Sequence, residues 1–208
     1  MLARYRTLRR EGAREIVIKK SRFIGYGKPV TSEEEAVAFV EAIRKKHWDA
    51  THNCYAYVIG ERDEIQKSSD DGEPSGTAGR PILEVIKAQQ LKNTAIVVTR
   101  YFGGIMLGAG GLIRAYTEGA VQAIEASEPI ERVLRRKVSV EADYTWYGKI
   151  ENELRSRGWH VGDTVFTDRV TVVCLPEEGE AERFIAWMTD LTQGRAAITP
   201  GEAEYYDF

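Results

Sequence analysis

Two glycine-rich segments carry the residues that could do chemistry in this chain. The first runs from Asp70 to Pro81 and reads DDGEPSGTAGRP. Its glycines allow successive backbone N–H groups to point into one concavity, and a helix beginning at Pro81 would add partial positive charge. Arg80 could close such a site on a phosphate through a bidentate contact. The alternative is an ordered turn that joins a strand to a helix.

The acidic residues of this first segment work against an anion. Asp70, Asp71 and Glu73 would repel a phosphate unless they orient Arg80 and the loop, or hold Mg²⁺ against the ligand. We assign no metal from the sequence. The segment contributes to the candidate site Asp71, Gly72, Glu73, Ser75, Gly76, Thr77, Gly79 and Arg80.

The second segment runs from Arg100 to Arg114 and reads RYFGGIMLGAGGLIR. Its last glycines precede a helix predicted from Leu112, and an arginine stands at each end. It is not a P-loop, because no Gly-Lys-Ser/Thr ends it, and it is only loosely similar to the dinucleotide fingerprint. The alternative is close backbone packing followed by a helix start. The segment contributes Arg100, Tyr101, Gly103, Gly104, Gly108, Gly110, Gly111 and Arg114.

Both segments flank Thr94–Thr99, an apolar, β-branched run that predicts a buried strand. Helices that follow neighbouring strands can begin at the same edge of a sheet. We therefore expect both loops to line one face, with Arg80, Arg100 and Arg114, and to bind phosphate or nucleic acid. Valine in place of Gly79 or Gly110 is expected to strain the backbone, on the premise that these glycines have positive φ.

His52 and Cys54 lie two residues apart on a predicted strand, so both side chains point to one face. A thiolate–imidazole pair would be a nucleophile. A buried cysteine beside a hydrogen-bonded histidine is the commoner arrangement, and we expect Cys54 to be buried and non-catalytic. His47 and His160 have no metal-ligand spacing, so no catalytic residue is assigned.

The rest of the chain predicts two domains, residues 1–130 and 131–208. Before Pro129 we expect strands at 15–20, 22–30, 53–59 and 94–101, helices starting at Ser32, Pro81 and Leu112, and loose packing of residues 1–13. After Pro129 we expect a strand at 133–142, a helix ending at Gly158, a hairpin around residue 167, a helix ending at Gly194 and a final strand. This βαββαβ order is the split βαβ arrangement of ferredoxin-like domains.

Composition excludes several classes. The 43% hydrophobic and 29% charged residues indicate a folded chain, and a net charge of −3 argues against general adhesion to nucleic acid but allows a local basic patch. Residues 1–130 carry 19 basic and 17 acidic residues, whereas residues 131–208 carry 10 and 15. There is no apolar run of membrane-helix length, no signal peptide, and no disulfide framework between Cys54 and Cys174. We expect a soluble, cytoplasmic protein without a cofactor.

The combined motifs are specific enough to indicate a family. They are His52-x-Cys54-Tyr55-Ala56-Tyr57, the run from Asp71 to Pro81, and Arg100-Tyr101-Phe102-Gly103-Gly104-x-x-Leu107-Gly108-x-Gly110-Gly111-Leu112. Together they resemble the IMPACT family, and its bacterial YigZ/YvyE-like branch in particular, over essentially the whole chain. The resemblance implies an α+β fold. It implies an N-terminal domain like the second domain of small-subunit ribosomal protein five, then a ferredoxin-like domain like the fifth domain of elongation factor G.

The functional implications of this resemblance leave three hypotheses. Eukaryotic relatives regulate translation by binding the activator of an initiation-factor kinase through an additional N-terminal domain. Residues 1–13 alone precede the first predicted strand here, so that activity is not expected. Fold likeness favours a non-enzymatic RNA- or ribosome-associated factor linked to translation regulation. The second hypothesis is an enzyme or sensor of a phosphorylated small molecule or nucleotide, because related kinases bind ATP phosphates with such loops. The third is a protein-interaction module.

Overall fold

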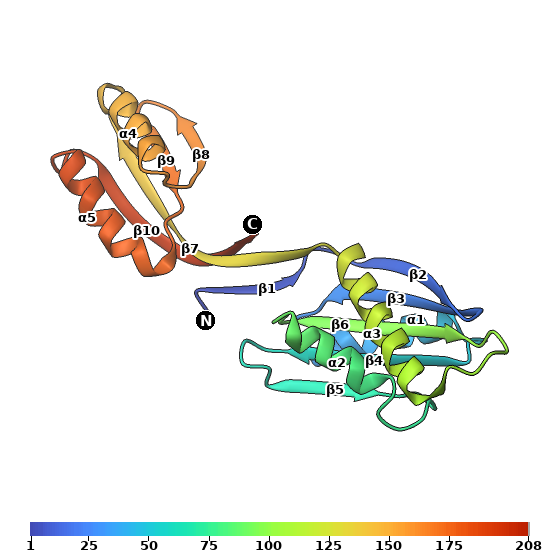
Figure 1. The fold of residues 1–208 in the computed structure, drawn as a ribbon. Helices are drawn as coiled ribbons and strands as arrows, with labels where there is room; N and C mark the ends of the chain where they lie inside the picture. Colours follow the sequence, from blue (N-terminus) through green and yellow to red (C-terminus); the bar gives the residue numbers. More distant parts are fainter. Residues whose placement is uncertain (208) are drawn as a thin grey trace. The chain divides into compact units, whose positions relative to one another are not determined.

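The computed structural model describes residues 1–207, which form two compact units (Figure 1). The N-unit is residues 5–131, and the C-unit comprises residues 1–4 and 132–207. Each unit has its own antiparallel sheet and hydrophobic core. The expected α+β fold class is confirmed.

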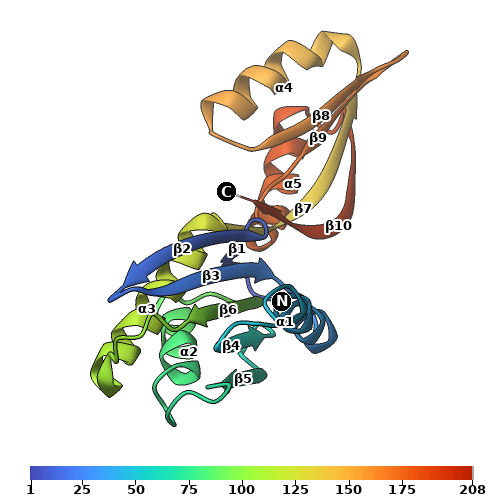
Figure 2. The ribbon, with the colours of Figure 1, turned by 90° about the vertical axis from the view of Figure 1, so that its right-hand side faces the viewer.

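The N-unit is built on a five-stranded antiparallel sheet in the order β2-β3-β6-β4-β5. Its strands are β2 (Gly12–Ile18), β3 (Ser21–Pro29), β4 (His52–Ile59), β5 (Ile65–Ser69) and β6 (Thr94–Tyr101). Its helices are α1 (Glu33–Lys46), α2 (Gly79–Ala88) and α3 (Gly108–Ala126). Helix α1 sits on one side of the sheet, and α2 and α3 cover the other (Figure 2).

The central strands are buried on both faces, because alternate side chains belong to the two different cores. In β4, Cys54 and Val58 belong to the core under α2 and α3, whereas Tyr57 and Ile59 belong to the core under α1. Successive side chains of a strand alternate between faces, so two helical layers bury side chains on both faces of such a strand. The sheet is therefore a rigid base from which the loops before α2 and α3 project.

The beginning of the chain is more ordered than its polar sequence predicts. Strand β1 spans Arg4–Leu8, and the Leu8 side chain is completely buried in the N-unit core. The backbone N–H groups of Arg9 and Arg10 donate to the Ser127 carbonyl oxygen. The expectation of loose packing for residues 1–13 is wrong, because one leucine and the backbone anchor this segment.

The C-unit has the expected βαββαβ order. Its elements are β7 (Pro129–Ala142), α4 (Tyr144–Ser156), β8 (Val161–Phe166), β9 (Val170–Cys174), the short 3₁₀ helix η1 (Glu178–Glu180), α5 (Ala181–Leu191) and β10 (Ala197–Asp207). The strands pair antiparallel in the order β10-β7-β9-β8, as in a ferredoxin-like domain. Ile150 and Leu154 of α4 and Phe184 of α5 pack on one core.

Strand β7 begins earlier than the sequence pattern predicts. It starts at Pro129 rather than Val133 and continues without interruption to Ala142. Proline is tolerated as the first residue of a strand because no ladder N–H is needed there. The chain therefore passes from the N-unit to the C-unit within a strand. Among residues 1–207, no helix combines the length and the apolar character required to cross a membrane.

Candidate functional site

The first glycine loop, between β5 and α2, is closed around its own Asp70. One carboxylate oxygen of Asp70 accepts from the Gly76 N–H at 2.9 Å, and the other accepts from Ala78 and Gly79 at 3.1 and 2.8 Å. Burial alone would raise the pKa of Asp70, but these three backbone hydrogen bonds outweigh it and hold the pKa below its ordinary value. The backbone N–H groups that the sequence suggested for phosphate binding thus already bind an anion, the Asp70 carboxylate.

Asp71 anchors the same loop to the sheet and to α1. Its carboxylate accepts from the Asn53 backbone N–H at 2.7 Å and from the Arg44 guanidinium at 3.1 Å. Its carbonyl oxygen accepts from His52 Nδ1–H at 2.8 Å. The two acids therefore fasten the loop to backbone N–H groups, the sheet and α1 rather than orienting Arg80. Within residues 1–207, no group of three or more metal-ligating side chains is present.

Glu73 lies at the centre of a buried polar cluster. Its Oε1 accepts from Arg100 Nη1 at 2.7 Å and from the Tyr116 hydroxyl at 2.6 Å, and His52 Nε2 is 3.6 Å from its Oε2. Arg100 is only 5% exposed, with its guanidinium against the rings of Phe23 and Phe102. This pair joins the two glycine segments, as expected for converging loops. It also removes Arg100 from the exposed face on which we expected all three arginines.

Cys54 is a buried thiol and not half of a nucleophilic pair. It is completely buried, and its S–H donates to the Asp70 carbonyl oxygen at 3.0 Å. Burial raises the pKa of the Cys54 thiol far above its ordinary value. His52 on the same face instead binds Asp71 and approaches Glu73. A protonated thiol that donates to a carbonyl cannot serve as a thiolate at neutral pH, and the predicted burial of Cys54 is confirmed.

The second glycine segment turns sharply and then enters α3 sooner than predicted. The Gly103 N–H donates to Ser21 Oγ at 3.1 Å, and a Cβ on Gly103 would lie 2.1 Å from the Lys20 backbone. Helix α3 begins at Gly108, four residues before the predicted Leu112. Gly110 and Gly111 therefore form the first turn of a helix and have no loop conformation.

The start of α3 is open, in contrast to the start of α2. Its first turn holds no acidic residue, and the residue before it, Leu107, makes no side-chain capping bond. Gly108 and Gly110 are exposed, and a Cβ built on Gly108 meets no atom within 4 Å. The first N–H groups of a helix lack partners within the helix. At α3 the residue before the helix gives these groups no side-chain acceptor, and the first-turn glycines Gly108 and Gly110 are exposed.

Three exposed cations lie on α3 or on segments that contact α3 or the loop before it. Arg114 lies one turn further along α3, with Nη1 3.6 Å from the position of a Gly110 Cβ. Arg80 borders a groove of about 530 Å³ between α2 and α3, where it is joined by Gly76, Ile113 and Thr117. The backbone of Lys20, in the β2–β3 turn, touches Gly103. None of these three cations forms an ion pair with another residue of the described chain.

Exposed apolar side chains occur in the loop before α3 and in the segment after α1. Phe102 is 48% exposed and Met106 is 84% exposed, both in the loop before α3, and Trp48 after α1 is 84% exposed. Tyr101 is held by hydrogen bonds to His47 and Asp49. Flat aromatic surfaces next to cations are typical of nucleic-acid interfaces.

The candidate binding residues predicted from the two glycine segments fall into exposed, partly buried and buried groups. The exposed ones are Gly72, Ser75, Arg80, Gly104, Gly108, Gly110 and Arg114. The partly buried ones are Asp71, Gly76, Tyr101, Gly103 and Gly111, and the buried ones are Glu73, Thr77, Gly79 and Arg100. Thr77 donates to the Pro74 carbonyl oxygen at 2.6 Å, which completes the loop fold. The candidate set therefore contains a structural group and a surface group.

Sequence reasoning missed several residues of this region. It did not place Tyr116 on Glu73, and it did not single out Lys20 or Trp48. The Lys19-Lys20 turn and the Lys45-Lys46-His47-Trp48 run were visible as basic positions next to a loop end or an aromatic residue. Tyr116 carried no local signal, because its partner lies 43 residues earlier in the chain.

The comparisons with known proteins identify the class to which this two-unit α+β fold belongs. The model of the Impact N-terminal domain matches residues 19–124, and a domain of unknown function, DUF1949, matches residues 140–195. The chain belongs to the IMPACT family.

Individual relatives support the assignment over the full length. IMPACT family member YvyE of Bacillus subtilis is 52% identical over 207 residues, which cover 100% of this chain and 95% of the relative. IMPACT family member YigZ of Escherichia coli is 37% identical, covering 85% of this chain and 88% of the relative. Protein IMPACT of Mus musculus is 36% identical over 98 residues, 45% of this chain and 30% of the mouse protein.

One solved structure has the same overall fold. It is described as the crystal structure of a hypothetical protein, with a TM-score of 0.62 and 31% identity. The alignment covers 97% of this chain and 99% of that one. The family and fold inferred from the motifs are thus confirmed.

Proposed function

We propose that the chain is a non-enzymatic RNA- or ribosome-associated cytoplasmic factor linked to translation regulation, and that the start of α3 binds phosphate groups of RNA. The observation that carries the proposal is the open first turn of α3 beside Arg114. Helix N-termini with free N–H groups bind phosphate through those groups and through the helix dipole. Glycines at positions 108, 110 and 111 leave the backbone accessible.

The surroundings of α3 support a polyanionic ligand. Lys20, Arg80 and Arg114 are exposed cations on segments that touch the second glycine loop or α3. Phe102 and Met106 offer apolar surface to unstacked bases. The first loop has a supporting role, since Asp70 fills its N–H cradle and the buried Glu73–Arg100 pair fixes its position.

The test is the salt dependence of binding to a fluorescein-labelled single-stranded RNA of sixteen nucleotides. Each phosphate interaction that a variant removes should reduce the slope of log K against log salt by about 0.7 for a single strand. Arg114→Ala and Lys20→Ala should each weaken binding and flatten the slope by about that amount. Arg62→Ala is the matched control, because Arg62 is exposed in the β4–β5 turn, at the opposite end of the sheet.

A nucleotide or phosphorylated small molecule is the second candidate. The groove of about 530 Å³ beside Arg80 favours it, because Pro81, Val85 and Ile113 supply an apolar wall near the helix start. ATP, GTP and ribose 5-phosphate would then give a saturable thermal shift that Arg80→Ala abolishes. An Arg80→Ala, Arg114→Ala double variant that behaves like the wild type in both assays would leave the protein-interaction module as the remaining hypothesis.

A further inference from the structure

The C-unit has a free strand edge at β8. Within the described chain, β8 pairs with β9 alone, so the other edge of β8 presents its backbone N–H and C=O groups unpaired. Three apolar side chains of this strand are exposed: Val161 by 45%, Val165 by 50% and Phe166 by 56%. An apolar free edge is uncommon on a folded domain, because it is a template for pairing with another chain.

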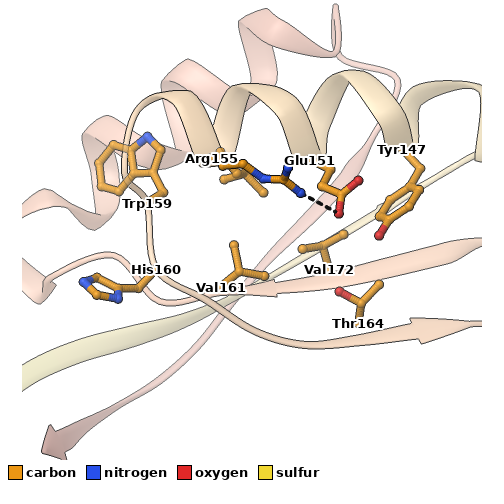
Figure 3. Close-up of a pocket in the computed structure, with 9 residues that line it drawn as sticks. Tyr147, Glu151, Arg155, Trp159, His160, Val161, Thr164 and Val172 are labelled. Atoms are coloured by element: carbon orange, nitrogen blue, oxygen red, sulfur yellow. Dashed lines mark hydrogen bonds and ion pairs between the residues drawn. The ribbon is translucent and has the colours of Figure 1, made fainter.

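A cavity of about 310 Å³ lies between this strand and α4 (Figure 3). Leu154 and Val172 are apolar residues of its lining, and Tyr147 and Trp159 add aromatic walls. A bulge in β8 contributes to the wall on the strand side. Val161 pairs with Cys174 and Thr164 with Val172, so three residues of β8 advance against two of β9. This irregularity places Val161 and Thr164 on the same cavity.

The acid and the arginine that line the cavity pair with each other, whereas two acids of the neighbouring β8–β9 hairpin have no such partner. Glu151 and Arg155 on α4 pair with each other at 3.4 Å. Asp163 in β8 and Asp168 in the following turn are exposed and have no ion-pair partner in the described residues. Residues 131–208 as a whole carry 10 basic and 15 acidic residues. The β8–β9 hairpin therefore offers two uncompensated carboxylates, one in β8 and one in the turn, to an incoming chain.

We propose that the groove between α4 and β8 binds an extended segment of a partner protein that carries Lys or Arg next to an apolar or aromatic residue. The segment adds to the sheet as a strand alongside β8, so its backbone supplies most of the affinity. Its alternate side chains point toward α4, and one apolar side chain fills the cavity. Its cations lie near Asp163 and Asp168.

The proposal is tested by panning the full-length protein against a phage-displayed library of random octapeptides. Enriched peptides should alternate apolar residues with Lys or Arg, and a proline at a pairing position should abolish binding. The selected peptides are then measured by fluorescence anisotropy against single variants. No enrichment, or enrichment of acidic peptides, would overturn the proposal.

Two matched variants test the groove itself. Thr164→Trp fills the cavity and should weaken binding about tenfold or more, whereas Val165→Trp, on the other face of the same strand, should leave it nearly unchanged. Asp163→Lys with Asp168→Lys should shift preference toward Glu-containing peptides. Equal binding to both tryptophan variants overturns the proposal. So does a wild-type dimer in sedimentation equilibrium that Thr164→Trp dissociates, since the occupant would then be a second copy of this chain.

Discussion

Replacement of Glu73 by glutamine is the sharpest test of how the two glycine segments are held together. Glutamine keeps the shape of the side chain and an oxygen that can still accept from Tyr116. It removes the negative charge that faces Arg100 at 2.7 Å. Both side chains are almost completely buried, at 3% and 6% side-chain exposure, so water cannot replace the missing partner.

The expected loss is large for one isosteric change. Removing one partner of a buried ion pair costs about 3–5 kcal/mol, because the remaining charge stays buried without compensation. Tyr116→Phe, which removes one hydrogen bond to the same carboxylate, should cost less, about 1.5–3 kcal/mol. Adding Arg100→Met to Glu73→Gln should recover part of the loss, because no unpaired charge then remains.

Native-state hydrogen exchange of β6 measures this loss within the N-unit itself. The slowest amides of β6 should exchange roughly 10²- to 4 × 10³-fold faster in Glu73→Gln than in the wild type. Glu125→Gln is the control: Glu125 pairs with Arg14 at the surface, so its loss should cost less than about 1 kcal/mol. If Glu73→Gln changes exchange no more than Glu125→Gln does, the argument that a buried pair joins the two loops fails.

Four further substitutions test other parts of the N-unit. Gly79→Ala should cost about 1–3 kcal/mol in urea unfolding, because its Cβ would lie 2.7 Å from the Ser69 backbone, whereas Gly110→Ala should be tolerated. Asp70→Asn should lower the melting temperature at pH 7. Since the folded pKa of Asp70 is lowered, that difference should shrink as the pH falls below about 4. Burial and Lys46 lower the pKa of His47, so wild-type stability should fall below about pH 6.5, and His47→Gln should flatten that loss.

The two glycines differ from what the sequence suggested. Neither Gly79 nor Gly110 is among the residues with positive φ, so the premise of left-handed backbone at these positions is wrong. Gly79 is required for another reason, the close approach of the Ser69 backbone. Positive φ occurs instead at Gly72, Gly76, Gly104 and Gly108. A glycine-rich segment indicates that some position needs a positive φ or a close backbone approach. The sequence pattern does not show which of the neighbouring glycines has that role.

Local periodicity made the framework predictable. The Ser32 side chain caps α1 by accepting from the Glu35 N–H, as the capping box indicates, and Ala36, Phe39, Val40 and Ile43 are the buried face of α1. Such signals depend on residues three or four apart. Contacts between distant residues lack this signal: Arg100 and Glu73 are 27 positions apart, and nothing in either neighbourhood identifies the other. The buried contacts of the candidate site, such as the Glu73–Arg100 pair, therefore could not be predicted from the sequence.

One difference between the glycine segments was nevertheless present in the sequence. Asp70 is the first residue of the first segment, and a carboxylate two to nine residues from glycine N–H groups is a natural internal acceptor. The second segment, from Arg100 to Arg114, holds no Asp, Glu, Asn, Ser or Thr that could cap the following helix. Helix α3 accordingly begins without a side-chain cap, whereas the N–H groups of Ala78 and Gly79 at α2 are bonded to Asp70. Similar glycine content thus leads to a self-satisfied loop in one case and an open helix start in the other. An external phosphate has to compete with Asp70 at the first segment and with water alone at the second, which is why the α3 start is the stronger place to look for a ligand.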